Sequence, residues 1–192
     1  MRILFTGGGT AGHVTPNIAL IKRLLAEGWQ VDYVGSKTGI ERELIAGVPG
    51  VTYHAISSGK LRRYFSWQNF ADPFRIVRGV FEARRLIRAC KPDVIFSKGG
   101  YVSVPVVVAA GKTPVVAHES DFSPGLANRI AARYADRVCV TFADTARHIS
   151  GGRAVHTGTP IRPELYAGDR DRALAFTGLS GDKPVLLVMG GS

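Results

Sequence analysis

A histidine directly after a glycine-rich turn is the first feature of the sequence that could do chemistry. The apolar run at residues 2–6 breaks into Gly7-Gly8-Gly9-Thr10-Ala11-Gly12 and continues through His13 into a helical pattern. Consecutive glycines let the backbone turn sharply, and the helix that follows directs its unpaired amide donors at the turn. Such a turn suits an anion, most often a phosphate. An imidazole at its mouth could serve as a general base, whereas the plainer interpretation is a tight turn whose histidine only packs or caps.

Three further polar or glycine-rich turns follow apolar runs. They are Lys98-Gly99-Gly100-Tyr101-Val102-Ser103, His118-Glu119-Ser120-Asp121 and Gly158-Thr159-Pro160-Ile161-Arg162. In an open parallel sheet, the carboxyl ends of the strands lie along one edge. We therefore expect these turns and the first glycine turn to converge on one crevice.

The elements that must position these turns alternate between strand and helix. Apolar runs predict strands at residues 2–6, 31–34, 51–56, 94–97, 115–117, 138–140 and 154–157. Helical spacing predicts helices at residues 18–25, 38–45, 70–88, 106–110 and 126–134. This alternation predicts an α/β fold, a Rossmann-like parallel sheet with helices on both faces.

The last residues predict a second domain. Residues 185–192 form an apolar strand pattern that enters a glycine turn with no helix after it. We therefore expect a Rossmann-like domain at residues 1–162, a connection at 163–184 and, at 185–192, the first strand of a domain that is cut off.

The net charge of +10 predicts an anionic partner. The segment from Lys60 to Arg88 contains eight basic residues and two acidic ones. No nucleic-acid-binding module is recognisable, so we expect no nucleic-acid partner. On the helix at 70–88, Phe74, Val77 and Phe81 share a face. We expect this stripe to pack on the core while the arginines of the helix are solvated.

The segment before this helix predicts a membrane contact. It interleaves apolar and aromatic side chains with arginines: Leu61, Arg62, Arg63, Tyr64, Phe65 and Trp67. Aromatic rings at the level of the lipid headgroups and cations on anionic lipids are what an interfacial contact requires. The sequence has no secretory leader pattern and only two cysteines, which are far apart. We therefore expect a cytoplasmic protein that contacts a membrane peripherally.

Other classes of enzyme fit the motifs less well. The glycine pattern suits a dinucleotide-binding dehydrogenase domain, but Gly35-Ser36-Lys37 follows the second strand and lacks the acid that binds the ribose. That domain stays a minor alternative. There is no Gly-x-Ser-x-Gly elbow of a serine hydrolase, and no pair among the five histidines has helical i, i+4 spacing. We predict no metal site.

The turns together resemble the MurG-type N-acetylglucosaminyltransferases of peptidoglycan synthesis, a family with the GT-B fold. Gly8-Gly9-Thr10-Ala11-Gly12-His13-Val14-Thr15-Pro16 resembles the first glycine loop of the family, with Ala11 where glycine is common. Gly99-Gly100-Tyr101-Val102-Ser103-Val104-Pro105 resembles the second loop and is the most specific motif.

The resemblance covers essentially the whole chain. His118-Glu119 is similar to the start of a His-Glu-Gln-Asn turn, with Ser120 and Asp121 in place of its last two residues. Asn128 matches an asparagine of the family, and Gly158-Thr159-Pro160-Ile161-Arg162 resembles Gly-Asn-Pro-Val-Arg. Gly190-Gly191-Ser192 resembles the start of a third glycine loop.

The resemblance implies the amino-terminal, acceptor-binding half of an inverting glycosyltransferase. The family transfers N-acetylglucosamine from UDP-N-acetylglucosamine to the muramoyl 4-hydroxyl of undecaprenyl-diphosphate-linked muramoyl pentapeptide. The implied partners are this acceptor lipid, the anionic inner face of the plasma membrane and a carboxy-terminal donor domain. UDP-N-acetylglucosamine is the implied donor substrate, with no tightly bound cofactor. The alternative is a non-catalytic, membrane-tethered half of a split glycosyltransferase.

The resemblance also implies roles for single residues. His13 is expected to be the base, and Glu119 the second catalytic group. The acceptor diphosphate and sugar are expected to contact Gly8, Gly9, Thr10, Gly12, Gly99, Gly100, Tyr101, Ser103 and Asn128. The donor side is expected to involve Thr10, Gly12, His13, Asn128, Arg162 and Ser192.

Overall fold

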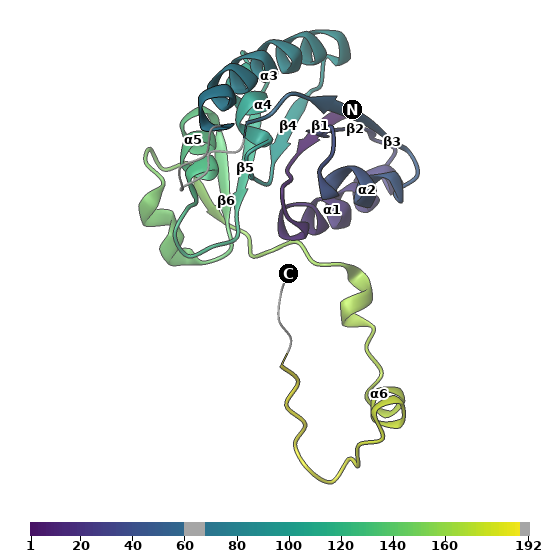
Figure 1. Cartoon of the computed structure of the whole chain (residues 1–192). Coiled ribbons are helices and arrows are strands. Elements are labelled where there is room, and N and C mark those ends of the chain that lie inside the picture. Colours follow the sequence, from purple (N-terminus) through teal and green to yellow (C-terminus); the bar gives the residue numbers. More distant parts are fainter. Residues whose placement is uncertain (60–67, 189–192) are drawn as a thin grey trace.

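The computed structural model describes residues 1–59 and 68–188, and its centre is a seven-stranded parallel sheet (Figure 1). The strand order is β3-β2-β1-β4-β5-β6-β7. The strands are β1 (Arg2–Thr6), β2 (Gln30–Ser36), β3 (Val51–Ile56), β4 (Val94–Ser97), β5 (Val115–Glu119), β6 (Arg137–Val140) and β7 (Ala154–His156). Every neighbouring pair is parallel. The predicted Rossmann-like sheet is confirmed.

Helices cover both faces of the sheet, as Figure 1 shows. One face packs against α1 (Thr15–Ala26) and α2 (Ile40–Ala46), and the other against α3 (Gln68–Cys90), α4 (Ser103–Ala109) and α5 (Leu126–Tyr134). Successive side chains of a strand point to opposite faces. Leu4 therefore joins the cluster under α3 and α4, while Ile3 and Phe5 join the cluster under α1 and α2.

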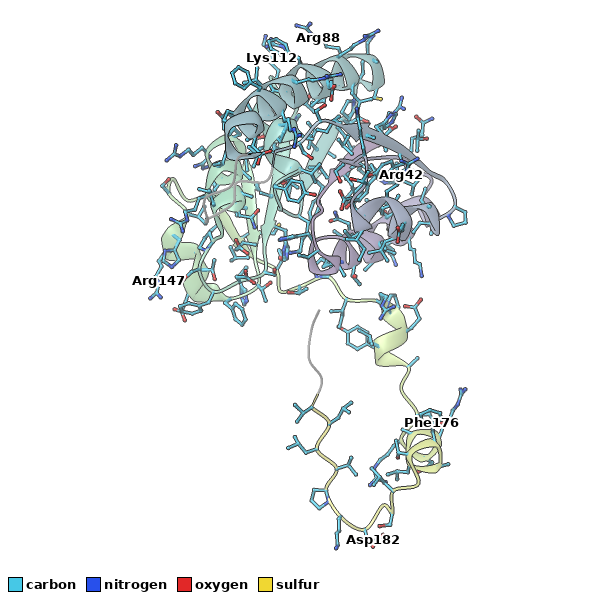
Figure 2. The ribbon with its side chains drawn as sticks, viewed as in Figure 1. Arg42, Arg88, Lys112, Arg147, Phe176 and Asp182 are labelled. Atoms are coloured by element: carbon cyan, nitrogen blue, oxygen red, sulfur yellow. The ribbon has the colours of Figure 1, made fainter. Side chains whose placement is uncertain are left out.

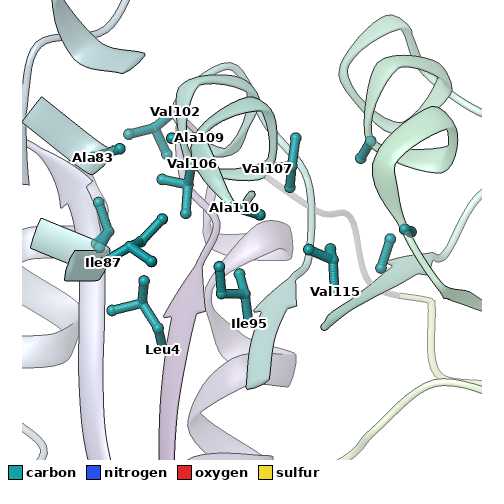
Figure 3. Packing of buried hydrophobic residues seen from close by; sticks show 14 of the residues in the cluster. Leu4, Ala83, Ile87, Ile95, Val102, Val106, Val107, Ala109, Ala110 and Val115 are labelled. Carbon is teal, nitrogen blue, oxygen red and sulfur yellow. The ribbon is translucent and has the colours of Figure 1, made fainter. Parts of the chain in front are cut away.

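The core under α3 and α4 is closely packed (Figure 3). Leu4, Ile95 and Val106 are completely buried, and Ile87 of α3 packs with them. Burying one such side chain contributes about 1.5–3 kcal/mol. A sheet covered on both faces needs apolar strands, and this explains why the uninterrupted apolar runs predicted the strands well.

The apolar stripe of α3 does not face the core, contrary to expectation. Phe74, Val77 and Phe81 are 79%, 55% and 69% exposed. The buried face of α3 lies on another side of the helix and combines Ile87 with small residues: Ala83 is buried, and a Cβ at Gly79 would overlap the Ser57 carbonyl oxygen. Small side chains let the helix approach the sheet closely. The spacing therefore identified an apolar face correctly and assigned it to the wrong side.

The segment after β7 extends away from the sheet (Figure 1). It contains a 3-10 turn at Pro163–Tyr166 and α6 (Arg170–Thr177), which the sequence did not predict. Figure 2 shows Phe176 and Asp182 on this extension, and Phe176 is 91% exposed. Residues 184–188, which include the start of the strand predicted at 185–192, have no regular secondary structure. Residues 189–192 lie outside the described ranges.

Two further properties bear on the environment of the protein. Within residues 1–59 and 68–188, no helix has the length and apolar character needed to cross a bilayer. Cys90 and Cys139 are both free thiols.

Candidate functional site

The two glycine turns meet where the strand order reverses. β1 and β4 are neighbours, and the chain moves outward from them in opposite directions, through β2 and β3 on one side and β5 to β7 on the other. Ligands of open α/β sheets bind in the crevice at such a switch point, beyond the carboxyl ends of the strands. The Gly8 amide donates to the Gly99 carbonyl oxygen at 3.4 Å. The predicted convergence of these two turns is thus present.

Glycine is required where the two turns touch. Gly100 has φ +82°, and a Cβ there would overlap the Gly8 carbonyl oxygen. Gly9 has φ +92°, and a Cβ there would lie 2.7 Å from the Tyr101 ring. Side chains at these positions would push the turns apart. Glycine therefore serves the close approach of two backbone segments as well as the sharpness of each turn.

The amides of the first turn are only partly available to a ligand. The Gly9 amide donates to Glu41 Oε2 at 3.1 Å, and the Gly8 amide donates to the Gly99 carbonyl oxygen. For Thr10, Ala11 and Gly12, the described residues offer no hydrogen-bond acceptor to the amide. These three open the 3-10 turn Ala11–His13 ahead of α1, so they are the donors that can receive an anion.

The second turn is held in shape by its own serine. Ser103 is buried, and both its amide and its hydroxyl donate to the Gly100 carbonyl oxygen, at 3.2 Å and 2.8 Å. The hydroxyl that we expected to contact a diphosphate therefore has an acceptor inside the turn. The Tyr101 ring lies against Gly9 and joins the two turns.

His13 lies at the mouth of the first turn in a form suited to accept a proton. Burial, followed by the positive charge of Lys98, lowers the pKa of His13, while the Lys98 carbonyl, Glu119 and Asp121 oppose this shift. The Nδ1 atom is buried without a hydrogen-bond partner among the described residues. The lowered pKa favours the uncharged imidazole, which is the form that a general base needs.

Lys98 is a residue of the crevice that the sequence prediction missed. Its side chain is completely buried, and Nζ donates to Ser120 Oγ at 3.0 Å. No carboxylate of the described residues lies within ion-pair distance of it. Burial lowers the pKa of Lys98, and Glu119 and Asp121 oppose this. The available signal was a lysine directly between a buried strand and a glycine turn.

Glu119 and Asn128 form one buried unit. The Glu119 carboxylate accepts from the Asp121 amide at 2.8 Å, the Gly125 amide at 3.2 Å and Asn128 Nδ2 at 2.8 Å. This fixes the turn between β5 and α5. Asn128 Oδ1 is buried without a partner among the described residues and borders Gly99, where an added Cβ would lie 2.5 Å from it. Asn128 therefore links this unit to the second glycine turn.

The turn after β7 is tied to the same edge of the sheet. His118 Nε2 donates to the Gly158 carbonyl oxygen at 2.9 Å, and burial lowers the pKa of His118. Arg162, farther along this turn, is exposed. Ser192 and the membrane segment from Leu61 to Trp67 lie outside the described residues, so their predicted roles stay predictions.

A cluster that could hold a metal lies at the opposite edge of the sheet. Ligand atoms of Asp32, His54 and Cys90 lie within 4.8 Å of one another. Asp32 Oδ2 already accepts from Arg2 Nε at 2.6 Å, and Oδ1 lies 2.7 Å from His54 Nε2. The guanidinium supplies the counter-charge that a metal ion would supply, so we do not include this cluster in the candidate site.

The family comparison decides the classification. Residues 3–140 match the family described as the glycosyltransferase family 28 N-terminal domain. The chain belongs to this family. The resemblance to the MurG-type enzymes is thereby confirmed, and the dinucleotide-binding alternative has no support, since Ser36 and Lys37 stand where such a domain needs an acid.

Relatives in family 28 are longer than this chain. The UDP-N-acetylglucosamine--N-acetylmuramyl-(pentapeptide) pyrophosphoryl-undecaprenol N-acetylglucosamine transferase of Clostridium botulinum (strain Langeland) is 54% identical, covering 100% of this chain and 54% of that protein. The protein of the same name from Lachnospira eligens is also 54% identical, with the same coverage. The crystal structure of Acinetobacter baumannii MurG matches with a TM-score of 0.70 and 29% identity, covering 86% of this chain and 47% of that one. The chain therefore spans about half the length of the curated relatives it matches.

Proposed function

We propose that this chain supplies the acceptor and membrane half of an inverting N-acetylglucosaminyltransferase. The reaction moves N-acetylglucosamine from UDP-N-acetylglucosamine to the muramoyl 4-hydroxyl of undecaprenyl-diphosphate-linked muramoyl pentapeptide. The hydroxyl attacks the anomeric carbon, UDP leaves, and His13 takes the hydroxyl proton. Glu119 and Asn128 orient the sugar or His13.

One observation carries this proposal: a partly buried histidine lies beside two glycine turns that meet at the switch point. The imidazole is the base that a hydroxyl nucleophile needs, and its low pKa suits that role. The amides of Thr10 to Gly12 provide donors for the acceptor diphosphate beside it. Base and anion donors therefore lie on the same short segment, as transfer to a diphosphate-linked sugar requires.

A basic cavity next to the second turn supports an anionic acceptor. Its volume is about 460 Å³, and it opens between the ends of β2 and β3 and the first half of α3. Its lining includes Lys37, Arg75, Arg78 and Tyr101. Asp72 also lines the cavity and lies 3.6 Å from Arg75, and Arg78 pairs with Glu82 at 2.9 Å. Lys37, which has no ion pair among the described residues, is therefore the lining cation that favours a negatively charged ligand.

The exposed stripe of α3 supports a membrane contact next to this cavity. Phe74, Val77 and Phe81 are exposed on the helix that also carries Arg75 and Arg78. Apolar side chains that enter the headgroup region, flanked by cations, hold a protein on an anionic bilayer. On this proposal, the lipid tail of the acceptor would lie near the stripe and its headgroup in the cavity, which Arg75 and Arg78 of the same helix line. The protein is then a peripheral protein of the inner face of the plasma membrane.

The donor site belongs to the carboxy-terminal half that the relatives possess. We expect the chain at residues 1–192 to bind the acceptor lipid weakly and to transfer no sugar. The test measures labelled N-acetylglucosamine on a lipid-linked muramoyl acceptor, using residues 1–192 alone and the same chain with a carboxy-terminal donor half. Transfer only with both halves is expected. Transfer by residues 1–192 alone would contradict the assignment, and acceptor binding without transfer by both halves would favour the non-catalytic alternative.

Liposome flotation tests the membrane contact. Phe74→Ser/Phe81→Ser is expected to reduce binding to anionic vesicles by about a hundredfold or more if both rings insert fully, because each ring then loses apolar burial of about 1.5–3 kcal/mol. The matched control is Phe176→Ser, which removes a similarly exposed ring from α6. Phe65→Ser/Trp67→Ser tests the segment before α3 in the same assay. If both double variants bind vesicles as strongly as wild type, the proposed membrane contact is contradicted.

A further inference from the structure

A buried carboxylate fills the hollow beside the first glycine turn. Glu41, the second residue of α2, is completely buried. Its Oε1 accepts from the Ser36 amide at 2.9 Å and from Ser36 Oγ at 2.6 Å, and its Oε2 accepts from the Gly9 amide at 3.1 Å. Donors from the turns after β1 and β2 thus converge on one side chain.

Three glycines make the space for this carboxylate. A Cβ at Gly8 would lie 2.6 Å from Glu41 Cδ, and one at Gly35 would lie 2.7 Å from Glu41 Cγ. A Cβ at Gly39 would overlap both carboxylate oxygens. A hollow that is lined by glycines and backbone amides is what phosphate-binding turns offer to a phosphate oxygen. Here the chain fills it with its own anion.

The surroundings of the carboxylate contain hydroxyls and amides instead of a cation. No Lys, Arg or His of the described residues forms an ion pair with Glu41. Tyr33 Oη donates to the Gly7 carbonyl oxygen at 2.8 Å, and Tyr53 Oη donates to the Ser36 carbonyl oxygen at 2.7 Å. Burial raises the pKa of both phenols, and the charge of Glu41 adds to the effect. The charge of Glu41 is therefore held by hydrogen bonds from the turns themselves.

We propose that Glu41 is a positioning residue, an internal anion that sets the shape of the first glycine turn. Glu41 accepts a hydrogen bond from the Gly9 amide. His13 follows four residues later, after Thr10, Ala11 and Gly12, whose amides have no acceptor within residues 1–59 and 68–188. Gly9 also contacts the Tyr101 ring, so the same contact sets the first turn against the second. This inference rests on the proposed function, because the turn is argued to hold the acceptor diphosphate.

An alternative role for Glu41 predicts the opposite effect of its removal on phosphate binding. If Glu41 were a placeholder that a ligand phosphate displaces, removing its charge would strengthen phosphate binding. If Glu41 shapes the turn, removing its charge weakens binding. A glutamine keeps the volume but brings an NH₂ group against the Gly9 amide or the Ser36 donors. The loss of one charge-assisted hydrogen bond then lowers binding or turnover by about tenfold to a hundredfold.

The experiment compares Glu41→Gln with Glu43→Gln in the protein that has both halves. Glu43 lies on the same helix, is exposed and loses the same charge, so it controls for net charge. We expect Glu41→Gln to raise the acceptor KM, or lower kcat, by about tenfold to a hundredfold relative to Glu43→Gln. Inorganic pyrophosphate should bind more weakly to Glu41→Gln. Kinetics equal to the control, or tighter binding of pyrophosphate, would overturn the proposal.

Amide NMR spectra separate this inference from the proposed function. In Glu41→Gln but not in Glu43→Gln, the amide resonances of Gly9 to Gly12 should shift and the Gly9 amide should exchange faster with solvent, whether or not the protein transfers sugar. Unchanged amides would overturn the role of Glu41, while absent transfer by wild type would overturn only the proposed function. If Glu41→Gln does not fold, Ser36→Ala decides, since it removes one donor to Oε1. A smaller change in the same amides is then expected, and spectra identical to wild type would overturn the proposal.

Discussion

Replacing Gly100 with alanine should separate the two glycine turns. Gly100 has φ +82°, and its added Cβ would overlap the Gly8 carbonyl oxygen. Gly28 has nearly the same backbone conformation, φ +80°, but a Cβ there would meet nothing within 4 Å. The pair therefore distinguishes the cost of the left-handed backbone from the cost of crowding the turns.

The expected loss of unfolding free energy in each variant follows from the surroundings of Gly28 and Gly100. A left-handed backbone costs a non-glycine residue about 1–2 kcal/mol, which is the whole expected effect of Gly28→Ala. Overpacking adds about 1–3 kcal/mol, so Gly100→Ala should lower the free energy of unfolding by about 2–5 kcal/mol. The clash involves backbone, so it is relieved only when one turn moves away from the other.

Urea denaturation of both variants measures the difference, and sugar transfer by the protein with both halves measures its consequence. Gly28→Ala should retain the transfer rate of wild type, and Gly100→Ala should lose most of it. Equal stability of the two variants, or full transfer by Gly100→Ala, would refute the argument that the turns must touch.

Three other perturbations test separate parts of the structure. Leu4→Ala should lower the free energy of unfolding by about 2–5 kcal/mol, because removing a buried side chain leaves a cavity. The control Leu186→Ala changes an exposed leucine and should alter this free energy by less than about 0.5 kcal/mol. Equal effects of the two variants in calorimetry would contradict the packing of Leu4 in the core. Lys98→Met removes a positive charge that opposes protonation of His13, so the pKa of His13 should rise. The acidic limb of the pH–rate profile should then move to higher pH. An acidic limb at the wild-type pH would rule out an effect of Lys98 on His13. Asp169 is the N-cap of α6, and its side chain accepts from the Arg172 amide in the first turn of that helix. Asp169→Ala should therefore destabilise α6 by about 1 kcal/mol, which should appear as faster hydrogen exchange of its amides. Unaltered exchange would exclude a stabilising role of this N-cap.

The sheet was predictable from sequence because it is buried on both faces. Apolar runs such as 94–97 and 138–140 end in turn residues, and the structure has β4 and β6 at these places. The meeting of the two glycine turns was also predictable, since parallel strands bring their carboxyl ends to one edge. Local pattern and global topology therefore agree at the centre of the candidate site.

Features that depend on the contact between elements were not predictable. The spacing of Phe74, Val77 and Phe81 defines a helix face but does not say whether that face is covered. Glu41 looks like a solvated residue on a short helix, and only the three-dimensional approach of α2 to the first turn buries it. Lys98 is likewise buried by the turn that carries Ser120, which lies far along the chain.

We propose above that His13 accepts the hydroxyl proton of the acceptor. The most direct test is the turnover of His13→Ala in the protein with both halves, measured as labelled N-acetylglucosamine transferred to the lipid-linked acceptor. His148→Ala is the control, because His148 is exposed and lies outside the crevice. We expect kcat to fall by about 10²- to 10⁴-fold in His13→Ala, which is the range for loss of a general base, and to stay near the wild-type value in the control. Turnover of His13→Ala close to that of His148→Ala would contradict it.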